Sequence, residues 1–200
     1  HRMTRPWCLP PVLARRALVA AVGSLLLPRP LRAEEVPVPL DLQAELLDKV
    51  AGYDRNFAAR AAGEARVLLV TRNGDPDSAR AASHLTSTLG RLGQLGGVRA
   101  SVSAAALSSP AALRSLVTEQ RLAVVYLMPG LAEAAEPIAA ALVGADILTV
   151  AVEPRLVARG TVLGFDLVSG KPKLLCHLGQ ARRQNVLFKA EILKLMKVYE

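Results

Sequence analysis

Short apolar runs alternate with longer amphipathic stretches through the middle of the chain. Four runs rich in valine, leucine and isoleucine have the length of strands, and they cover residues 66–71, 98–103, 122–128 and 146–152. Continuous apolar runs of this kind are typical of strands buried in a parallel sheet. The second run alternates apolar with polar residues, which favours an edge strand with one wetter face.

Helices are predicted between these runs. Asp75 stands before a proline and a second aspartate, the composition of a helix start, and the helix continues to about Leu92. Ser109 precedes another such proline and begins a second helix, and residues 131–143 form a third. Strand and helix therefore alternate, which predicts an α/β fold with a mainly parallel sheet of about four strands and helices on both faces.

A further helix is predicted at the start of the folded domain, with Asp41 as its cap. Apolar side chains recur there at helical spacing, and these are Leu42, Leu46, Val50, Tyr53 and Phe57. One apolar stripe of this kind packs against a core more often than against a partner.

The C-terminal part is predicted to form an antiparallel hairpin, which extends one edge of the sheet, and a closing helix. Residues 161–168 and 173–178 are two alternating segments joined through a serine, a glycine, a lysine and a proline. A short helical turn over residues 180–185 ends at Asn185, which tolerates a left-handed backbone. The closing helix is expected from Phe188 onward. Its apolar side comprises Phe188, Ile192, Leu195 and Tyr199, and Lys189, Lys194 and Lys197 lie on another side.

The N-terminal segment has the layout of a signal peptide. Basic residues up to Arg16 precede a mostly apolar run at residues 17–27, and Ala33 ends a small-residue cleavage site. The apolar run is well short of the roughly 20 residues that span a bilayer, so a retained membrane anchor is not favoured. We expect residues 1–33 to be the signal peptide, residues 34–39 a tether and residues 40–200 a single α/β domain, located in the periplasm. Arg15 and Arg16 resemble a twin-arginine signal, which leaves the Sec and twin-arginine routes open, and His1 and Arg2, which precede the first methionine, are given no role.

Charge along the chain argues against nucleic-acid binding. The formal net charge of +8 falls to +2 when the six arginines before residue 34 are set aside. A protein that binds the phosphate backbone needs a clustered basic surface, and the remaining charges are mixed along the chain.

Cysteine usage limits the redox chemistry of the exported domain. Cys8 would leave with the signal peptide, so Cys176 would have no intramolecular disulfide partner. Cys176 lies among leucines of a predicted strand, and a buried thiol is its ordinary state. A redox thiol that forms a mixed or intermolecular disulfide is the alternative.

Motifs that would indicate catalysis, a cofactor or a metal do not fit. The glycines between Gly164 and Gly170 are wrongly spaced for a phosphate loop, and those of residues 90–97 follow a helix rather than a strand. His177 projects from the opposite strand face to Cys176, so the two cannot chelate one metal. No Gly-x-Ser-x-Gly elbow occurs. We therefore expect a protein that is not an enzyme and holds no metal or cofactor.

A binding crevice is predicted at the carboxyl ends of the parallel strands, where open α/β sheets bind their ligands. The candidate residues are polar or punctuate the chain just after an apolar run, and they are Thr71, Asn73, Ser103, Pro129, Gly130 and Glu153. They would suit a small solute but select no substrate.

The last third of the chain resembles the YfiR/HmsC-like family of small periplasmic proteins. The resemblance lies in Ile147-Leu148-Thr149-Val150, Arg159-Gly160 followed by Phe165, Ala181-Arg182-Arg183, Ile192-Leu193-Lys194-Leu195 and, near the start, Lys49-Val50-Ala51-Gly52-Tyr53 with Phe57. The resemblance implies a compact α/β sandwich. It also implies a regulator that binds the periplasmic sensor domain of an inner-membrane signalling protein, typically a diguanylate cyclase, and holds it inactive.

Two features depart from the family pattern. His177 stands where members often have asparagine, and no Trp-Pro follows Phe57. Disulfide control of the kind found in some members cannot carry over with Cys176 alone.

Three classes of function follow from these observations. The leading hypothesis is an exported, non-enzymatic regulator of a membrane sensor, with Arg159 and Phe165 added to the strand-end residues as candidate binding residues. The alternative is a periplasmic small-solute binding protein that uses the strand-end crevice. A hydrolase comes third and would need Ser103, Cys176 or a histidine as a reacting group. A homodimer stays open.

Overall fold

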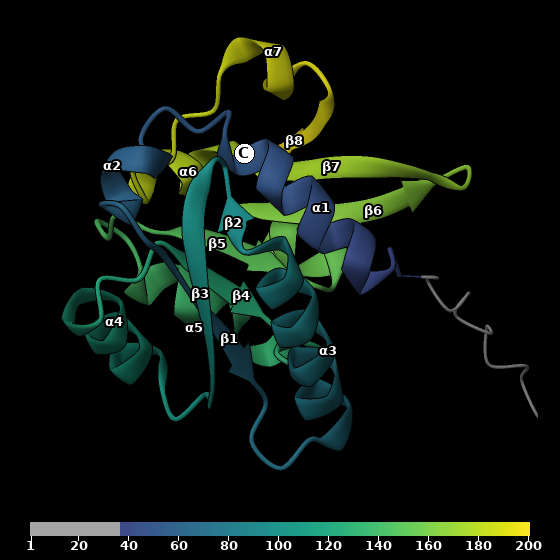
Figure 1. Ribbon diagram of the computed structural model, residues 1–200. Coiled ribbons are helices and arrows are strands. Elements are labelled where there is room, and N and C mark those ends of the chain that lie inside the picture. The colour runs from purple at the N-terminus through teal and green to yellow at the C-terminus, as the bar shows by residue number, and fades with distance from the viewer. Residues whose placement is uncertain (1–36) are drawn as a thin grey trace, which may run out of the picture. The chain divides into compact units, whose positions relative to one another are not determined.

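The computed structural model describes residues 37–200, which belong to one compact unit. The predicted signal peptide, its cleavage site and Cys8 lie outside the described residues, as does most of the predicted tether. Figure 1 shows the arrangement of the helices and strands.

One mostly parallel sheet forms the centre of the fold, in the order β2-β3-β1-β4-β5-β6-β7-β8. The bounds are β1 Ala65–Thr71, β2 Gln94–Leu95, β3 Val98–Ala106, β4 Val124–Leu127, β5 Leu148–Ala151, β6 Leu163–Val168, β7 Lys171–His177 and β8 Met196–Tyr199. The α/β class and the mainly parallel sheet are confirmed. The sheet has eight strands and not about four: the hairpin extends it as predicted, and two short strands, β2 and β8, were not predicted.

Helices cover both faces of the sheet, as the alternation of strands and helices predicted. Val67 and Leu69 of β1 pack in the core with α1 (Leu40–Ala51) and α3 (Pro76–Leu92). Leu68 and Val70 point the other way, into a second core with α4 (Pro110–Glu119), α5 (Ala135–Ala141) and the 3-10 helix η2 (Pro154–Arg159). Successive side chains of a strand point to opposite faces, so a fully apolar strand serves two cores at once.

The predicted helix starts at Asp75 and Ser109 are confirmed. The Asp75 carboxylate accepts hydrogen bonds from the backbone N–H groups of Asp77 and Ser78, and the Ser109 hydroxyl accepts one from Ala112. The predicted third helix divides into a 3-10 turn, η1 (Ala132–Ala134), and α5.

The first helix is shorter than its apolar stripe predicted. It ends at Ala51, and Phe57 begins a separate helix, α2 (Phe57–Ala61). Asp41 is not the cap, because Pro39 occupies that position and Asp41 lies in the first turn. The helix ends with Gly52 as its C-cap, and the chain then turns to Asp54, which forms a β-bridge with Phe188 from the C-terminal part of the chain. The local helical period is therefore not continued, and a tertiary pairing follows the end of the helix.

The hairpin of β6 and β7 is confirmed as antiparallel. It is followed by α6 (Leu178–Arg183), and Asn185 has a positive φ of 57°, as expected for a residue that ends a helix. In Figure 1 the turn of this hairpin reaches beyond the other strands.

The predicted closing helix is wrong. Only one turn, α7 (Ala190–Leu193), is helical, and residues from Met196 onward form β8, which pairs in parallel with β7. The outer edge of β7 offers unpaired backbone groups, and satisfying them outweighs the amphipathic period. Leu195, which was expected on the packed side of a helix, is 61% exposed.

The expectation that the second run is an edge strand holds over most of β3. Its outer neighbour, β2, pairs only with Val98 and Arg99. Beyond Arg99, β3 has no second neighbour among the described residues.

Candidate functional site

A pocket of about 550 Å³ lies at the carboxyl ends of the parallel strands, at the edge where the sequence predicted a crevice. Asn73 follows β1, Leu107 follows β3 and Gly130 follows β4, and all three line it. Arg155, from η2, completes the wall on another side. The fold therefore brings Asn73 and Gly130 together, although they are far apart in the sequence.

Gly130 joins this pocket to the start of α3. Its φ of +88° lies in the left-handed region, and a Cβ atom placed there would lie 2.7 Å from Asp75 Oδ2. The backbone N–H of Gly130 donates to Glu153 Oε1 at 3.3 Å, and Glu153 also pairs with Arg155 at 2.8 Å. Glu153 thus supports the pocket from its position after β5, and Pro129 is half-buried beside Gly130.

Pro129 and Glu153 adjoin this pocket without lining it, and the two remaining predicted residues, Thr71 and Ser103, lie elsewhere. Thr71 lines a shallow groove between α3 and β3. Ser103 is not at a strand end, because β3 continues to Ala106 and remains in register with β1 as far as Thr71. The polar alternation in the second run concealed this extension, since the residues after Ser103 are alanines without strong strand preference.

Arg159 and Phe165 are separate from the crevice and from each other. The Arg159 guanidinium donates to Glu136 of α5 at 3.0 Å and lines a different depression with His177. Phe165 is fully buried in the core. Its side chain therefore contributes to packing and presents no surface to a partner in this conformation.

Cys176 is fully buried in β7, and burial raises the pKa of its thiol to about 12. A thiol in this state has almost no thiolate at neutral pH, and the thiolate is the reactive form. The adjacent His177 has a structural contact, because its Nδ1 accepts a hydrogen bond from the backbone N–H of Gln180 at 3.1 Å and so caps α6. Desolvation lowers the pKa of His177.

The other described histidine, His84, lies 3.2 Å from Asp41 at the surface. Among residues 37–200, no three histidine, cysteine or acidic side chains gather into a set that could hold a metal ion.

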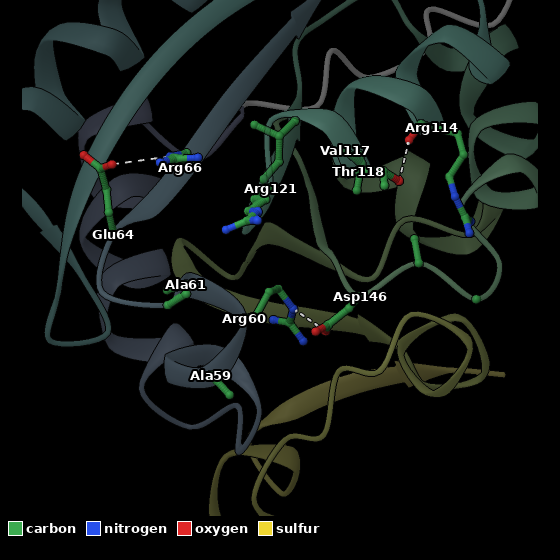
Figure 2. A pocket seen from close by; sticks show the side chains of 14 residues that line it. Ala59, Arg60, Ala61, Glu64, Arg66, Arg114, Val117, Thr118, Arg121 and Asp146 are labelled. Carbon is green, nitrogen blue, oxygen red and sulfur yellow. Dashed lines mark hydrogen bonds and ion pairs between the residues drawn. The ribbon is translucent and has the colours of Figure 1, made fainter.

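A second pocket, of about 410 Å³, lies at the opposite edge of the sheet, where the parallel strands begin (Figure 2). The sequence reasoning missed it. Its charged lining comprises Arg60, Arg66, Arg114, Arg121, Glu64 and Asp146. Four guanidinium groups against two carboxylates give this lining a formal charge of +2.

Arg60, which lines this second pocket, forms a buried ion pair with Asp54. Arg60 Nη1 lies 2.7 Å from Asp54 Oδ2, and the two side chains are 2% and 0% exposed. Arg60 Nε also donates to Asp146 at 2.8 Å, and Nη2 donates to the carbonyl of Asn185 at 3.0 Å. Asp54 in turn accepts from the backbone N–H of Leu187 at 3.0 Å. This network ties α2, the start of β5 and the segment after α6 together.

One signal in the sequence could have indicated this pocket. A charged residue stands at or just before the start of three apolar runs: Arg66 before β1's apolar residues, Arg121 before β4 and Asp146 before β5. The amino ends of parallel strands meet at one edge of a sheet, so these side chains had to lie near one another. Arg60 and Arg114 come from helices and gave no such signal.

The described part of the chain contains no helix that is both long and apolar enough to cross a membrane.

Comparison with known proteins identifies a family. The sequence model of the family described as YfiR/HmsC-like matches residues 76–197, which is more than half of the chain. No curated protein gives a significant match.

Several solved structures share the fold at low sequence identity. One is a domain in complex with L-Trp from Streptococcus pneumonia, with a TM-score of 0.58, 10% identity and coverage of 81% of this chain and 62% of that one. Another is a conserved domain protein from Vibrio cholerae O1 biovar El Tor, with a TM-score of 0.58, 13% identity and coverage of 81% and 60%. A third is CD0873 from Clostridium difficile, a substrate binding protein with adhesive properties, with a TM-score of 0.58, 11% identity and coverage of 82% and 60%. The chain thus spans about three fifths of the length of these structures, and the likeness concerns the fold alone.

Proposed function

The chain belongs to the YfiR/HmsC-like family, and from this membership we propose that it is an exported, non-enzymatic regulator. It binds the periplasmic sensor domain of an inner-membrane signalling protein, of the diguanylate cyclase or histidine kinase type, and represses it. Repression requires only that the regulator bind the inactive conformation of the sensor more tightly than the active one. The family match carries this proposal.

Regulation of this kind needs a surface that binds the sensor, and the edge of the sheet at β8 has the features of one. We use the name docking surface for β8 together with Tyr53, Leu187 and Leu195. Four of the six large apolar side chains that are exposed among the described residues belong to it, and these are Tyr53, Leu187, Leu195 and Val198. Aromatic and apolar side chains in the centre of an interface supply most of its binding energy.

The backbone of β8 offers a second means of recognition. β8 is the last strand in the sheet order and pairs only with β7 among the described residues. An exposed strand edge can add a strand from a partner, so that main-chain hydrogen bonds contribute affinity. Lys189 lies with its ammonium 5.9 Å from the centre of the Tyr53 ring, and Lys194 and Lys197 are exposed nearby. We therefore expect an apolar strand with acidic flanks on the sensor.

The states of the predicted reacting groups support the non-enzymatic part of the proposal. Cys176 is buried with a raised thiol pKa, His177 caps a helix, and Ser103 donates only to a backbone carbonyl, at 3.5 Å. Among residues 37–200, neither Ser103 nor Cys176 is hydrogen-bonded to a base that would activate it, and His177 is engaged by the backbone of α6.

The test is recovery of the sensor from the membrane. The chain carries an affinity tag in the predicted tether, is exported by its own host and is cross-linked before the membranes are solubilised. Mass spectrometry is expected to identify a membrane protein with a cyclase or kinase output domain, and deleting the gene should raise that output. An unchanged second-messenger level in the deletion strain would count against repression.

A matched pair of variants locates the docking surface. Val198→Asp places a charge on β8, whereas Val143→Asp makes the same change after α5, and the two valines are 42% and 47% exposed. Val198→Asp is expected to abolish recovery of the sensor and Val143→Asp to leave it unchanged. Equal recovery with both variants would move the docking surface elsewhere, and the region of the half-buried Arg159 would be tested next.

Small-solute binding at the strand-end pocket is the second candidate function. It is favoured by the pocket that Asn73 and Gly130 line, with Thr71, Pro129 and Glu153 close to it in the fold. A solute that binds only the folded state raises the melting temperature. A screen of periplasmic solutes in which Asn73→Ala removes such a rise, with no sensor recovered, would favour this function over regulation.

A further inference from the structure

We propose that the pocket at the amino ends of the strands binds a small dianion of the phosphate monoester class, with Arg121 as its main contact. This site is independent of the docking surface and of the strand-end pocket. It does not rest on the proposed regulatory function.

Arg121 lines the pocket with a guanidinium group that has no partner among residues 37–200. It follows α4 with a left-handed φ of 50°. Among residues 37–200, only its backbone N–H has a partner, the carbonyl of Thr118 at 3.4 Å, and no hydrogen bond or ion pair engages its guanidinium. In the view of Figure 2, Arg121 extends between the Arg66–Glu64 pair on one side and the Arg60–Asp146 pair on the other. A left-handed conformation is uncommon for a residue with a Cβ atom, and here it directs a cation into the pocket.

Arg114 contributes a second charge that no carboxylate of residues 37–200 neutralises. Its Nη1 donates to the carbonyls of Ala141 and Val143, at 3.1 and 2.8 Å. Carbonyl groups at the end of a helix orient a guanidinium but leave its formal charge in place. The planar group is thus held in position at the wall of the pocket before any ligand arrives.

The remaining two arginines are compensated by acids. Arg66 lies 3.3 Å from Glu64 and also donates to the carbonyl of Gln120 at 3.0 Å. The hydrogen bond from Arg66, with the charge of Arg99 nearby, holds the pKa of Glu64 below its usual value. Arg60 is engaged by Asp54 and Asp146.

The ordinary structural role of an arginine near a helix end is to bond the last carbonyls, and it accounts for Arg66 and Arg114. It does not account for Arg121. The excess of two positive charges in the lining therefore resides in Arg114 and Arg121.

The charge and size of the pocket define the ligand. A phosphate monoester carries about two negative charges at neutral pH, which equals the excess of the lining. Guanidinium groups bind phosphate oxygens in a forked, bidentate geometry. The volume of about 410 Å³ is within the range of small-molecule sites, so there is room for the organic group of the ester as well as its phosphate.

The test is a titration of the full chain, exported and purified, with glycerol 3-phosphate as the probe. Ionic strength is kept constant with sodium chloride, because salt screens exposed charges. NMR signals of the arginine Nε–H groups report the contact. Saturable shifts are expected for Arg121 and Arg114, and succinate, a dianion without phosphate geometry, should bind more weakly. Absence of saturation, or binding of succinate alone, would overturn the proposal.

Substitutions distinguish the site from general charge attraction. Arg121→Gln is expected to weaken glycerol 3-phosphate binding about tenfold or more, since one charge-assisted contact is lost. Lys171→Gln removes the same charge at the exposed turn of the β6–β7 hairpin and should leave the affinity within about twofold. Within the described part of the chain the Arg121 side chain makes no hydrogen bond or ion pair, so its variant should keep the wild-type melting temperature. Equal affinities of the two variants would refute the site.

Discussion

The two ends of the parallel sheet are built from different chemistry. At the carboxyl ends, Asn73 and Gly130 line a pocket with Arg155, which forms a partly exposed ion pair with Glu153. At the amino ends, arginines line a pocket, and one of them, Arg60, forms a buried ion pair with Asp54. The first end matches the general rule for ligand sites in open α/β sheets, whereas the second holds the excess charge. A positional rule therefore indicates where a fold can bind a ligand, whereas the distribution of charge is the basis on which we propose a second site at the opposite end.

The largest effect is expected from the buried pair at the amino ends. Asp54→Ala leaves Arg60 buried with one fewer carboxylate and removes the acceptor for the Leu187 backbone N–H, so it should lower the free energy of unfolding by about 3–5 kcal/mol. Urea denaturation measures this loss. Asp146→Ala removes the other partner of the same arginine, but that carboxylate is 51% exposed, and the expected cost is about 1 kcal/mol or less. Similar losses for the two variants would show that burial does not set the energetics of this end.

A smaller effect is expected from closing the pocket at the carboxyl ends. Gly130→Ala forces a left-handed alanine, at a cost of about 1–2 kcal/mol, and also brings a methyl group against the Asp75 carboxylate. Gly74 is the matched control, because its φ of +71° is also positive but a Cβ atom there would meet nothing within 4 Å. Gly130→Ala should therefore be the more destabilising of the two in urea denaturation. It should also leave the binding of glycerol 3-phosphate at the other end unchanged, and a change there would contradict the separation of the two pockets.

The cap of α3 should contribute less. Asp75→Ala removes the acceptor of two backbone N–H groups and is expected to cost about 1 kcal/mol. Asp77→Ala, in the first turn of the same helix, removes a surface pair with Arg80 whose side chains are 77% and 74% exposed, and about 0.5 kcal/mol or less is expected. Thermal unfolding of both variants checks the order. A larger loss for Asp77→Ala than for Asp75→Ala would mean that the charge in the first turn, and not the cap, stabilises the start of α3.

The smallest expected effect concerns how the free energy of unfolding depends on pH. It involves His177, the last residue of β7, which lies at the amino ends of the parallel strands. Desolvation lowers the pKa of His177 from its ordinary value of 6.5, so the folded state binds fewer protons than the unfolded one. The stability that the neutral histidine contributes is fully present above about pH 6.5 and is lost as the pH falls toward the lower, folded-state pKa. Asparagine also caps helices, so His177→Asn should keep the cap and reduce this acid loss.

Urea denaturation at pH 7.5 and at pH 5.0 measures the effect of this substitution. The free energy of unfolding should fall less on acidification in His177→Asn than in the wild type. An identical pH dependence for wild type and His177→Asn would show that His177 does not titrate within this range.

The candidate sites were predictable to different extents. Asn73 and Gly130 follow apolar runs directly, so the rule that strand ends meet was enough to bring them to one edge. The prediction that Ser103 lies at a strand end was wrong, because β3 continues through three alanines, and these show no alternation of apolar and polar residues. The pocket at the amino ends was not fully predictable, because two of its residues, Arg60 and Arg114, lie on helices. Which end of the sheet a helical residue approaches depends on how the helices pack.

The sequence by itself determined the α/β class, the mainly parallel central strands, the caps of α3 and α4 and the hairpin, because each of these depends on residues that are near one another in the chain. Family membership follows from the sequence as well. Only the tertiary structure decided that the last residues form a strand and that the first helix stops at Ala51. In both places, backbone groups from distant parts of the chain satisfy each other: β8 pairs with β7, and Asp54 bridges to Phe188. A local hydrophobic period cannot report such partners, since the hydrogen bonds that outweigh it exist only once the sheet is assembled.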